Sequence, residues 1–409
     1  MPARELSALR PRPRVLSGMR PTGALHLGHY HGALKNWVRL QDEYDCFYFV
    51  ADWHALTTHY QDREVIERNV YDMVIDWLAA GLDPERSTIF IQSRLPEHAE
   101  LFTLLAMGTP LGWLERVPTY KDQIEKLKDR DLATYGFLGY PLLQAADILI
   151  YKAAFVPVGE DQSSHVELTR EVARRFNHLY GRGADFDARA AAAQAKLGKD
   201  DSRYFERQRK AFGETGAAEA LAKGEAMVHK AAALLSPEET ELLLGHLRGA
   251  GRTVLPEPLA LHTDVAKLPG LDGAKMSKSY GNSIAMRDEP AVVTQKLKRM
   301  PTDPQRVRRT DPGDPTRCPV WQFHQVYSDA ATQDWVVQGC TSAGIGCLDC
   351  KQPVIDAILA EQAPWRERAE TFLANPKQVQ WIVEMGTERA RTVARQTMKD
   401  VREAMGLNY

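Results

Sequence analysis

Short apolar segments alternate with longer amphipathic segments through residues 14–180, and this alternation constrains the fold more than any other feature. Val15–Gly18, Asp45–Ala51 and Thr88–Gln92 have the length and apolar character of buried strands. Glu64–Ala80 carries apolar residues at helical spacing, which predicts an amphipathic helix. Strands that alternate with helices form a parallel sheet covered on both faces, with ligands at the carboxyl ends of the strands. The sequence therefore predicts an α/β fold.

The rest of the chain is predicted to be helical. Residues 181–252 are rich in Ala, Glu, Lys and Arg, and Ser236-Pro237 is a typical N-cap followed by proline at the first helical position. The strand pattern resumes near Arg252–Leu261, and Gln378–Leu407 is expected to be a long final helix. We therefore divide the chain into a flexible leader (1–13), a sheet domain (14–180 and 253–283), a helical insertion (181–252) and a C-terminal helical domain (284–409).

Bulk properties exclude some classes of protein. The chain has 409 residues, which suits two or three domains. It contains no apolar run of the ~20 residues that a membrane helix needs, and its first residues lack the apolar core of a secretory signal. We therefore expect a cytoplasmic protein without membrane contact. The net charge of −2 neither indicates nor excludes a nucleic-acid partner; Lys296–Arg309 is a candidate basic surface, or simply a solvated charged face.

Two histidines stand three residues apart in His26-Leu27-Gly28-His29, just after the first predicted strand. At a strand-to-helix junction, helix N–H groups and the helix dipole favour an anion, and both imidazoles could hydrogen-bond a phosphate. Gly28 would let a flat base or a ribose approach the backbone. The alternatives are two capping or surface histidines, or the similar motif of a nucleotidylyltransferase.

A second candidate is the segment Lys275-Met276-Ser277-Lys278-Ser279, which lies among glycines. Two lysines and two hydroxyls in such a loop could hold the β- and γ-phosphates while pyrophosphate leaves, because donors placed at developing charge lower the barrier. The alternative is an exposed basic loop. Its occurrence together with the histidine motif makes chance a poor explanation of both.

These two segments resemble the HIGH and KMSKS signatures of class I aminoacyl-tRNA synthetases, with Leu27 in place of the usual isoleucine. The text between them resembles the tryptophanyl-tRNA synthetases in particular, as in SGMRPTGALHLGHYHGAL, VADWHALT, YPLLQAADILIYKA and VPVGEDQSSHVELTREVARRFN. The resemblance covers nearly everything except the leader and the insertion. It implies a Rossmann-type catalytic domain, a helical domain on the anticodon side of the tRNA, and a homodimer.

The resemblance also assigns site residues. Asp147 corresponds to the aspartate that binds indole, and a carboxylate suits this role because indole has one N–H donor and no acceptor. The catalytic residues would be His26, His29, Lys275 and Lys278. Tryptophan would be bound by Asp147, Tyr140, Gln162 and His54. ATP would be bound by Arg20, Pro21, Thr22, Gly28, His29, Gly159, Glu160, Asp161, Lys275, Met276, Ser277, Lys278 and Ser279.

The sequence also departs from many relatives. Arg20 stands where they have glutamine, and Gln144 where they have methionine. They also have a catalytic lysine after the segment that corresponds to Glu115-Arg116. Lys121 and Lys126 are both candidates for that role.

The implied reaction joins L-tryptophan to AMP from ATP and then transfers the aminoacyl group to the 3′ end of tRNA(Trp). The tryptophan carboxylate attacks the α-phosphate in line, Mg²⁺ accompanies the phosphates, and no covalent enzyme intermediate forms. Two other readings are a non-catalytic paralogue that binds tRNA or tryptophan, and a tyrosyl-tRNA synthetase.

Four of the five cysteines cluster late in the chain, at Cys318, Cys340, Cys347 and Cys350. Four thiols in a cytoplasmic protein indicate a metal site more often than disulfides, and their chemistry allows Zn²⁺ or an iron–sulfur cluster. A subset of bacterial tryptophanyl-tRNA synthetases carries a [4Fe–4S] cluster on nearly this spacing, so the resemblance favours the cluster over zinc. Cys46, inside an apolar run, is expected to be a buried small side chain.

Overall fold

The computed structural model describes residues 12–117, 134–159, 163–183, 185–249, 251–262, 268–277 and 280–409. The chain divides into two compact units. The first contains the chain up to Arg94, Pro157–Gly159 and His262–Arg389, and the second contains Leu95–Val156, Glu160–Leu261 and Ala390–Tyr409. Among the described residues, no helix is long and apolar enough to cross a membrane.

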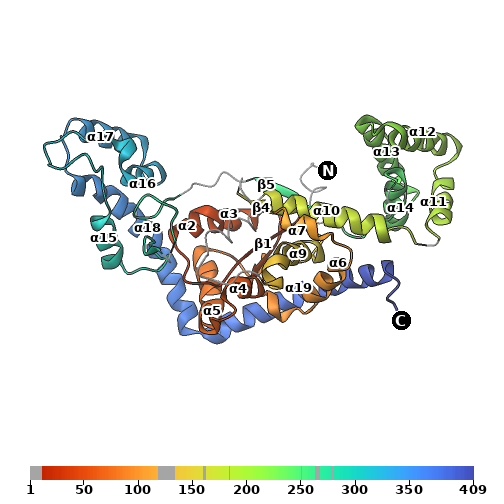
Figure 1. Cartoon of the computed structure of the whole chain (residues 1–409), viewed down its shortest axis with the longest axis horizontal. Helices are drawn as coiled ribbons and strands as arrows, with labels where there is room; N and C mark the ends of the chain where they lie inside the picture. Colours follow the sequence, from red (N-terminus) through yellow and green to blue (C-terminus); the bar gives the residue numbers. More distant parts are fainter. Residues whose placement is uncertain are drawn as a thin grey trace, which may run out of the picture. The chain divides into compact units, whose positions relative to one another are not determined.

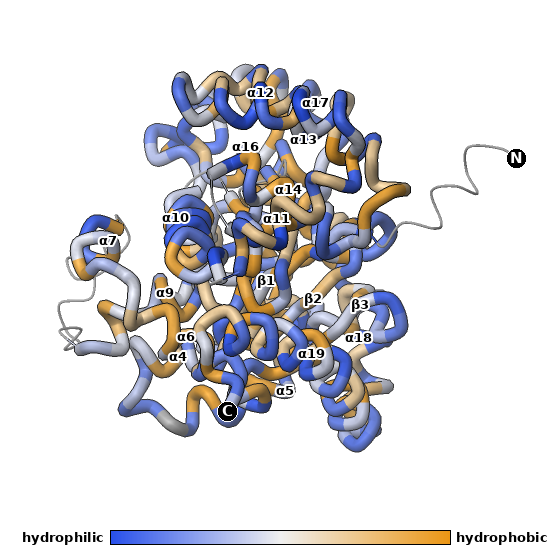
Figure 2. The backbone as a smooth tube through the Cα atoms, turned by 90° about the vertical axis from the view of Figure 1, so that its right-hand side faces the viewer, coloured by the Kyte–Doolittle hydropathy of each residue, from blue (hydrophilic) through white to orange (hydrophobic). Residues whose placement is uncertain are grey.

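A five-stranded sheet with the strand order β3-β2-β1-β4-β5 forms the centre of the fold. The strands are β1 (Arg14–Met19), β2 (Asp45–Val50), β3 (Ser87–Ile91), β4 (Phe155–Val158) and β5 (Leu259–His262). The pairs β1–β2 and β2–β3 are parallel, as the alternation of strands and helices predicts. Figure 2 shows apolar residues along β1 and β2, and the buried Cys46 lies in this apolar layer as expected.

Helices from distant parts of the sequence pack together in the first unit. They are α2 (Leu27–His29), the π-helix η1 (Tyr30–Leu34), α3 (Lys35–Leu40), α4 (Asp52–His59), α5 (Arg63–Ala80), α15 (Pro290–Arg299), α16 (Pro319–Tyr327), α17 (Ala330–Thr341), α18 (Cys347–Ala374) and the first half of α19 (Pro376–Ala404), with the short helices η2 (Gln92–Arg94) and η6 (Pro315–Arg317). The predicted helices at 64–80 and 378–407 are therefore present with slightly shifted ends.

Close contacts fix the C-terminal helices against the N-terminal part of this unit. The rings of Trp365 on α18 and Tyr30 on η1 lie 4.2 Å apart between centroids, and Arg368 Nε donates to the carbonyl of Ala79 at the end of α5, 2.6 Å away. A Cβ added to Gly386 on α19 would lie 1.9 Å from the carbonyl oxygen of Ile89, so only glycine allows α19 to approach β3 this closely. Figure 2 shows polar and apolar residues alternating along α19, as expected for a helix with one buried face.

The second unit consists mainly of helices. They are α6 (Glu97–Ala106), α7 (Leu111–Glu115), α9 (Tyr135–Ile150), α10 (Ser163–Tyr180), α11 (Phe186–Ala195), α12 (Lys199–Thr215), α13 (Ala218–Lys230), η4 (Ala231–Ala233), α14 (Pro237–Leu247) and the second half of α19. Helices α11 to α14 gather beyond the end of α10 (Figure 1) and bury a core of their own that includes Phe186, Phe205 and Leu243. The predicted start of α14 is confirmed, because Ser236 and Glu239 form a reciprocal capping box.

The two ends of the chain segment that forms α11 to α14 are held together. The backbone N–H of Arg252 donates to the carbonyl of Gly181 over 2.8 Å. The side chain of Asn177 accepts from Val254 N and Leu255 N and donates to Leu255 O, at 2.9, 3.0 and 2.7 Å. These three hydrogen bonds allow the buried amide only one orientation, so Asn177 fixes the point at which the chain returns to α10.

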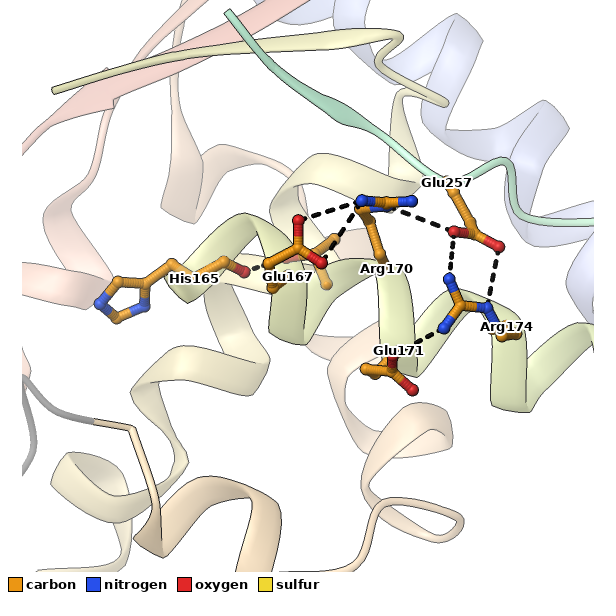
Figure 3. Close-up of polar contacts among 7 residues, drawn as sticks. His165, Glu167, Arg170, Glu171, Arg174 and Glu257 are labelled. Carbon is orange, nitrogen blue, oxygen red and sulfur yellow. Dashed lines mark hydrogen bonds and ion pairs between the residues drawn. The ribbon is translucent and has the colours of Figure 1, made fainter. Parts of the chain in front are cut away.

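Charged side chains add a second tie at the same place. Glu257 accepts from Arg170 and Arg174, two arginines on α10, with Nη2 of Arg174 2.7 Å away (Figure 3). The same arginines also bond Glu167 and Glu171, one turn earlier on the helix (Figure 3). This network is largely exposed, so we assign it a modest contribution to stability.

Candidate functional site

The two histidines of the first motif lie stacked at the start of α2. Their ring centroids are 3.7 Å apart, and the backbone N–H of His26 donates to Nδ1 of His29 over 3.2 Å. Burial, with Lys275 as a second cause, lowers the pKa of His26 to about 4. Burial, with His26 and Lys275 as further causes, lowers the pKa of His29 to about 3. Both imidazoles are therefore neutral near pH 7, and each can donate a hydrogen bond to an anion without carrying a charge.

The second motif lies against the first within the same compact unit. A Cβ added to Gly28 would lie 3.4 Å from the Cβ of Met276, so Met276 packs directly on the glycine between the histidines. The segment that follows the lysine loop pairs with the histidine turn: Leu27 N donates to Ile284 O at 3.0 Å and Met286 N donates to Leu25 O at 2.9 Å. The structure thus brings His26, Gly28, His29, Lys275 and Met276 together. Lys278 and Ser279 lie outside the described residues.

Asn282 organises the lysine loop, and sequence reasoning missed it. Its side-chain oxygen accepts from Ser277 N at 2.7 Å, and its amide donates to Lys275 O at 3.1 Å and to Asp272 Oδ1 at 2.8 Å. A Cβ on Gly270 would lie 2.3 Å from the Asn282 amide nitrogen, which explains the need for glycine there. The only signal in the sequence was an asparagine beside a glycine, which ordinarily indicates a turn.

A buried ion pair anchors the segment that pairs with the histidine turn. Arg287 bonds both Asp72 and Asp76 on α5, with Nε 2.5 Å from Asp76 Oδ1. Burial raises the pKa of Asp76 to about 7, and the guanidinium of Arg287 opposes this rise. Removing Arg287 would leave a buried acid without its main cationic partner, so this contact holds the position of the motif. No pattern in the sequence indicated this pairing.

Several other residues that the sequence predicts in the ATP or tryptophan site also belong to the first unit. Arg20, Pro21 and Thr22 form the turn after β1, where Thr22 N donates to Arg20 O at 2.8 Å. His54 is buried on α4, and Gly159 directly follows β4. Asp52, the first residue of α4, accepts from Ser93 N at 3.0 Å, and burial raises the pKa of its carboxyl group.

Asp147 is fully buried on α9 in the second unit and is held by a histidine from α6. Asp147 Oδ1 lies 2.6 Å from Nδ1 of His98, and Nε2 of His98 lies 2.7 Å from the hydroxyl of Tyr151. Asp147 and Tyr151 are four residues apart, which places both on the face of α9 that packs on α6. His98 was not predicted, since a lone histidine after a proline carries no sequence signal.

Of the two residues predicted to bind the substrate amino group, the structure describes Tyr140 and leaves out Gln162. Tyr140 lies on α9 with its ring 5.6 Å from that of Phe137 and 5.7 Å from that of His165, between centroids. Gln162, Glu160 and Asp161 lie outside the described residues. So do Lys121 and Lys126, the two candidates for an additional catalytic lysine.

The four clustered cysteines belong to the first unit and are free thiols in the structure. Burial raises the pKa of Cys350 to about 12, and Cys318, Cys340 and Cys347 are near enough to add to this rise. Within the described parts of the chain, however, no group of three or more His, Cys, Asp or Glu side chains is arranged to hold a metal ion. A metal centre at these cysteines is therefore not shown.

Cationic and histidine side chains surround these thiols. Nε2 of His324 lies 3.4 Å from Sγ of Cys350. Lys351 is buried, donates to Lys298 O and Met300 O at 2.9 and 2.5 Å, and is electrostatically coupled to the thiols. Arg306 lowers the pKa of Cys340, in opposition to the effect of burial. Part of the predicted basic segment at 296–309 thus makes contacts within the protein, near the thiols.

Comparisons with known proteins agree with this geometry. The family of class I tRNA synthetases for tryptophan and tyrosine (W and Y) matches residues 9–203 and 240–360. A tryptophan–tRNA ligase of Ralstonia nicotianae is 64% identical over 97% of this chain and 99% of its own length, and one of Thermotoga maritima is 44% identical over 97% and 100%. The crystal structure of tryptophanyl-tRNA synthetase from Campylobacter jejuni, complexed with ADP and tryptophan, superposes with a TM-score of 0.71 at 28% identity, covering 96% of this chain and 100% of that one. The predicted Rossmann-type α/β fold with a C-terminal helical region is confirmed, and the chain belongs to the class I aminoacyl-tRNA synthetases, in the branch of the bacterial tryptophan–tRNA ligases.

Proposed function

We propose that this chain activates L-tryptophan with ATP at the histidine turn and the lysine loop, and then transfers the tryptophanyl group to tRNA(Trp). The observation that carries the proposal is the pairing of the two motifs in one compact unit. Met276 packs on Gly28, and Lys275 is electrostatically coupled to both His26 and His29. A non-catalytic binder of tRNA or tryptophan would have no use for a lysine held beside two buried imidazoles.

The first step forms one bond and breaks another at the α-phosphorus. A carboxylate oxygen of tryptophan attacks phosphorus, and the bond to the bridging oxygen of the β-phosphate breaks, which releases pyrophosphate and leaves tryptophanyl-AMP. In this proposal His26 and His29 donate hydrogen bonds to phosphate oxygens. Lys275 and Lys278 hold the β- and γ-phosphates, where negative charge grows. Mg²⁺ would neutralise the same phosphates.

We assign the remaining contacts as follows. The ATP-binding residues are Arg20, Pro21, Thr22, Gly28, His29, Gly159, Glu160, Asp161, Lys275, Met276, Ser277, Lys278 and Ser279. Asp147 accepts the indole N–H, Tyr140 and Gln162 hold the amino group, and His54 borders the tryptophan pocket. A carboxylate in this position favours tryptophan over phenylalanine, because phenylalanine would leave the buried acceptor without its donor.

Pyrophosphate exchange dependent on the amino acid tests this proposal. Purified protein is incubated with ATP, labelled pyrophosphate and either tryptophan or tyrosine. Exchange with tryptophan alone is the expected result. Exchange with tyrosine would identify a tyrosyl enzyme, and tight binding of tryptophan without any exchange would identify a non-catalytic paralogue.

In the second step, the 2′-hydroxyl of the terminal adenosine attacks the carbonyl carbon of tryptophanyl-AMP, and AMP leaves. We propose that residues 284–409 form the domain on the anticodon side, that 181–252 are a helical insertion into the domain formed by 14–180 and 253–283, and that the enzyme acts as a homodimer. Sedimentation with and without tRNA(Trp) distinguishes a dimer that binds tRNA from a monomer.

We also propose that Cys318, Cys340, Cys347 and Cys350 hold a [4Fe–4S] cluster, with Zn²⁺ as the alternative. Four thiolates around either centre leave a net negative charge, which fits the buried Lys351 and the neighbouring Arg306. Such a centre would act in structure or in tRNA contact, and aminoacylation needs no redox step.

Metal and sulfide analysis tests the cluster. Protein purified without oxygen should be brown and contain iron and acid-labile sulfide, and C350S should lose both, whereas the control C46A should retain them. Stoichiometric zinc without sulfide would contradict the cluster and support the alternative.

A further inference from the structure

We infer that His98 is a positioning residue for substrate recognition, which holds the Asp147 carboxylate as the acceptor of the indole N–H. This inference deepens the proposed function and rests on the assignment of Asp147 to tryptophan. Three fully buried side chains take part, namely His98, Asp147 and Tyr151.

The directions of the two hydrogen bonds follow from the chemistry of the groups. An ionised carboxylate only accepts, so Nδ1 of His98 must be the donor in the 2.6 Å contact with Asp147 Oδ1. In a neutral imidazole the other nitrogen then accepts, so Nε2 accepts a hydrogen bond from the Tyr151 hydroxyl, 2.7 Å away. Tyr151 thus donates to His98, and His98 donates to Asp147, so both hydrogen bonds are directed toward the carboxylate.

This arrangement solves a problem that a buried acceptor presents. A carboxylate removed from water tends to take up a proton, and a protonated Asp147 could present an O–H donor to the indole N–H instead of an acceptor. A donated hydrogen bond from His98 favours the ionised form and fixes the side-chain rotamer. One carboxylate offers about four lone-pair positions, so accepting from His98 is compatible with accepting from a substrate as well.

The helices that carry these residues are well placed for the task. Asp147 lies in the last turn of α9 and Tyr151, four residues later, is the C-cap of that helix, while His98 lies in the first turn of α6, after Pro96. The first turn of α6 is tied down separately, because Arg395 and Arg402 on α19 bond Glu97 and Glu100. His98 is therefore a fixed support for the carboxylate.

Two variants separate the two ring nitrogens of His98. In H98N, the amide nitrogen occupies the place of Nδ1 and can still donate to Asp147. In H98Q, the amide nitrogen occupies the place of Nε2 and the donor to Asp147 is lost. The measured quantity is kcat/KM in pyrophosphate exchange for L-tryptophan, divided by that for L-3-benzothienylalanine, in which sulfur replaces the indole N–H.

If His98 supports the acceptor, H98Q lowers this ratio by about tenfold or more, in line with the loss of a hydrogen bond to a charged group. H98N should keep the ratio within a few-fold of wild type. In a D147A background, H98Q should lower the ratio no further, because the two residues act as one unit.

Other results would overturn the inference. If H98Q slows both substrates equally, His98 only supports the fold. If circular dichroism shows that H98Q does not fold, the same ratio is measured for the Y151F variant instead. A lowered ratio in Y151F supports the chain of hydrogen bonds, and a ratio equal to that of wild type contradicts it. A wild-type protein without tryptophan-dependent exchange would instead refute the proposed function, so the two failures are distinguishable.

Discussion

The protein contains two networks of histidine, tyrosine and carboxylate, one buried and one partly buried, that differ in the arrangement of their hydrogen bonds. In the second unit, His98 stands between Tyr151 and Asp147 and uses a different ring nitrogen for each. In the first unit, His31, Tyr327 and Glu361 meet one another pairwise. Nε2 of His31 lies 2.8 Å from the Tyr327 hydroxyl and 3.1 Å from Glu361 Oε2, and that hydroxyl donates to Glu361 over 2.8 Å.

The difference indicates different roles. The linear network directs its donors toward one fully buried carboxylate, which suits a group that must act as an acceptor. The closed network joins η1, two residues after His29, to α16 and α18, and the side chain of Glu361 is still 21% exposed. Its three members satisfy each other, which suits a structural tie between the histidine turn and the C-terminal helices.

Substitutions of the two carboxylates should differ most in their effect on tryptophan activation. We expect D147A to lower kcat/KM for tryptophan on the order of 10³-fold, because the indole N–H loses its buried acceptor. E361Q should keep the discrimination between tryptophan and benzothienylalanine, since the closed network does not contact the indole in our proposal. Pyrophosphate exchange measures both. Normal tryptophan activation by D147A would refute the assignment of the acceptor.

A substitution in the lysine loop of the first unit should change the KM for ATP. N282A removes the amide that fixes Ser277 and Lys275, so KM for ATP should rise about tenfold, while KM for tryptophan changes little. N36A, which removes a surface asparagine bonded only to Arg39 among the contacts described, is the matched control. An unchanged ATP dependence in N282A would mean that the loop keeps its form without this side chain.

The closed network should contribute to stability and leave specificity unchanged. Y327F removes one hydroxyl from a partly buried triangle, and we expect the free energy of unfolding to fall by about 1–2 kcal/mol. Urea denaturation measures this loss, and Y409F at the exposed C-terminus serves as the control. A change in the ratio of tryptophan to benzothienylalanine activity in Y327F would remove the functional distinction between the two networks.

Stability should also depend on pH through the two stacked histidines. The folded pKa values of His26 and His29, about 4 and about 3, lie below the ordinary value of 6.5. Below pH 6.5 the unfolded chain therefore binds protons that the folded chain does not, so these residues reduce stability progressively as pH falls toward 4 and then 3. The double variant H26N/H29N should lose less melting temperature between pH 7 and pH 4.5 than wild type. An equal or larger loss would show that these histidines titrate normally.

Much of the architecture followed from local pattern. Asp45–Val50 and Ser87–Ile91 are strands because short apolar runs are bounded by polar residues, and Arg63–Ala80 is a helix because its apolar residues recur at helical spacing. The helix expected at the histidine motif is the least accurate of these elements. It begins at Leu27 and contains a π-helical turn over Tyr30–Leu34, which the periodicity of so short a segment did not reveal.

The sequence alone determined which residues we propose for the chemistry of phosphate and indole, because histidine, lysine and aspartate stand there in a recognisable order. Tertiary structure alone decided what holds them: His98 meets Asp147 across 49 residues, and Arg287 meets Asp76 across 211. The physical reason is that periodicity and capping report hydrogen bonds made within a few residues. A buried polar side chain must instead be satisfied by whatever the fold places beside it, and that neighbour can come from anywhere in the chain.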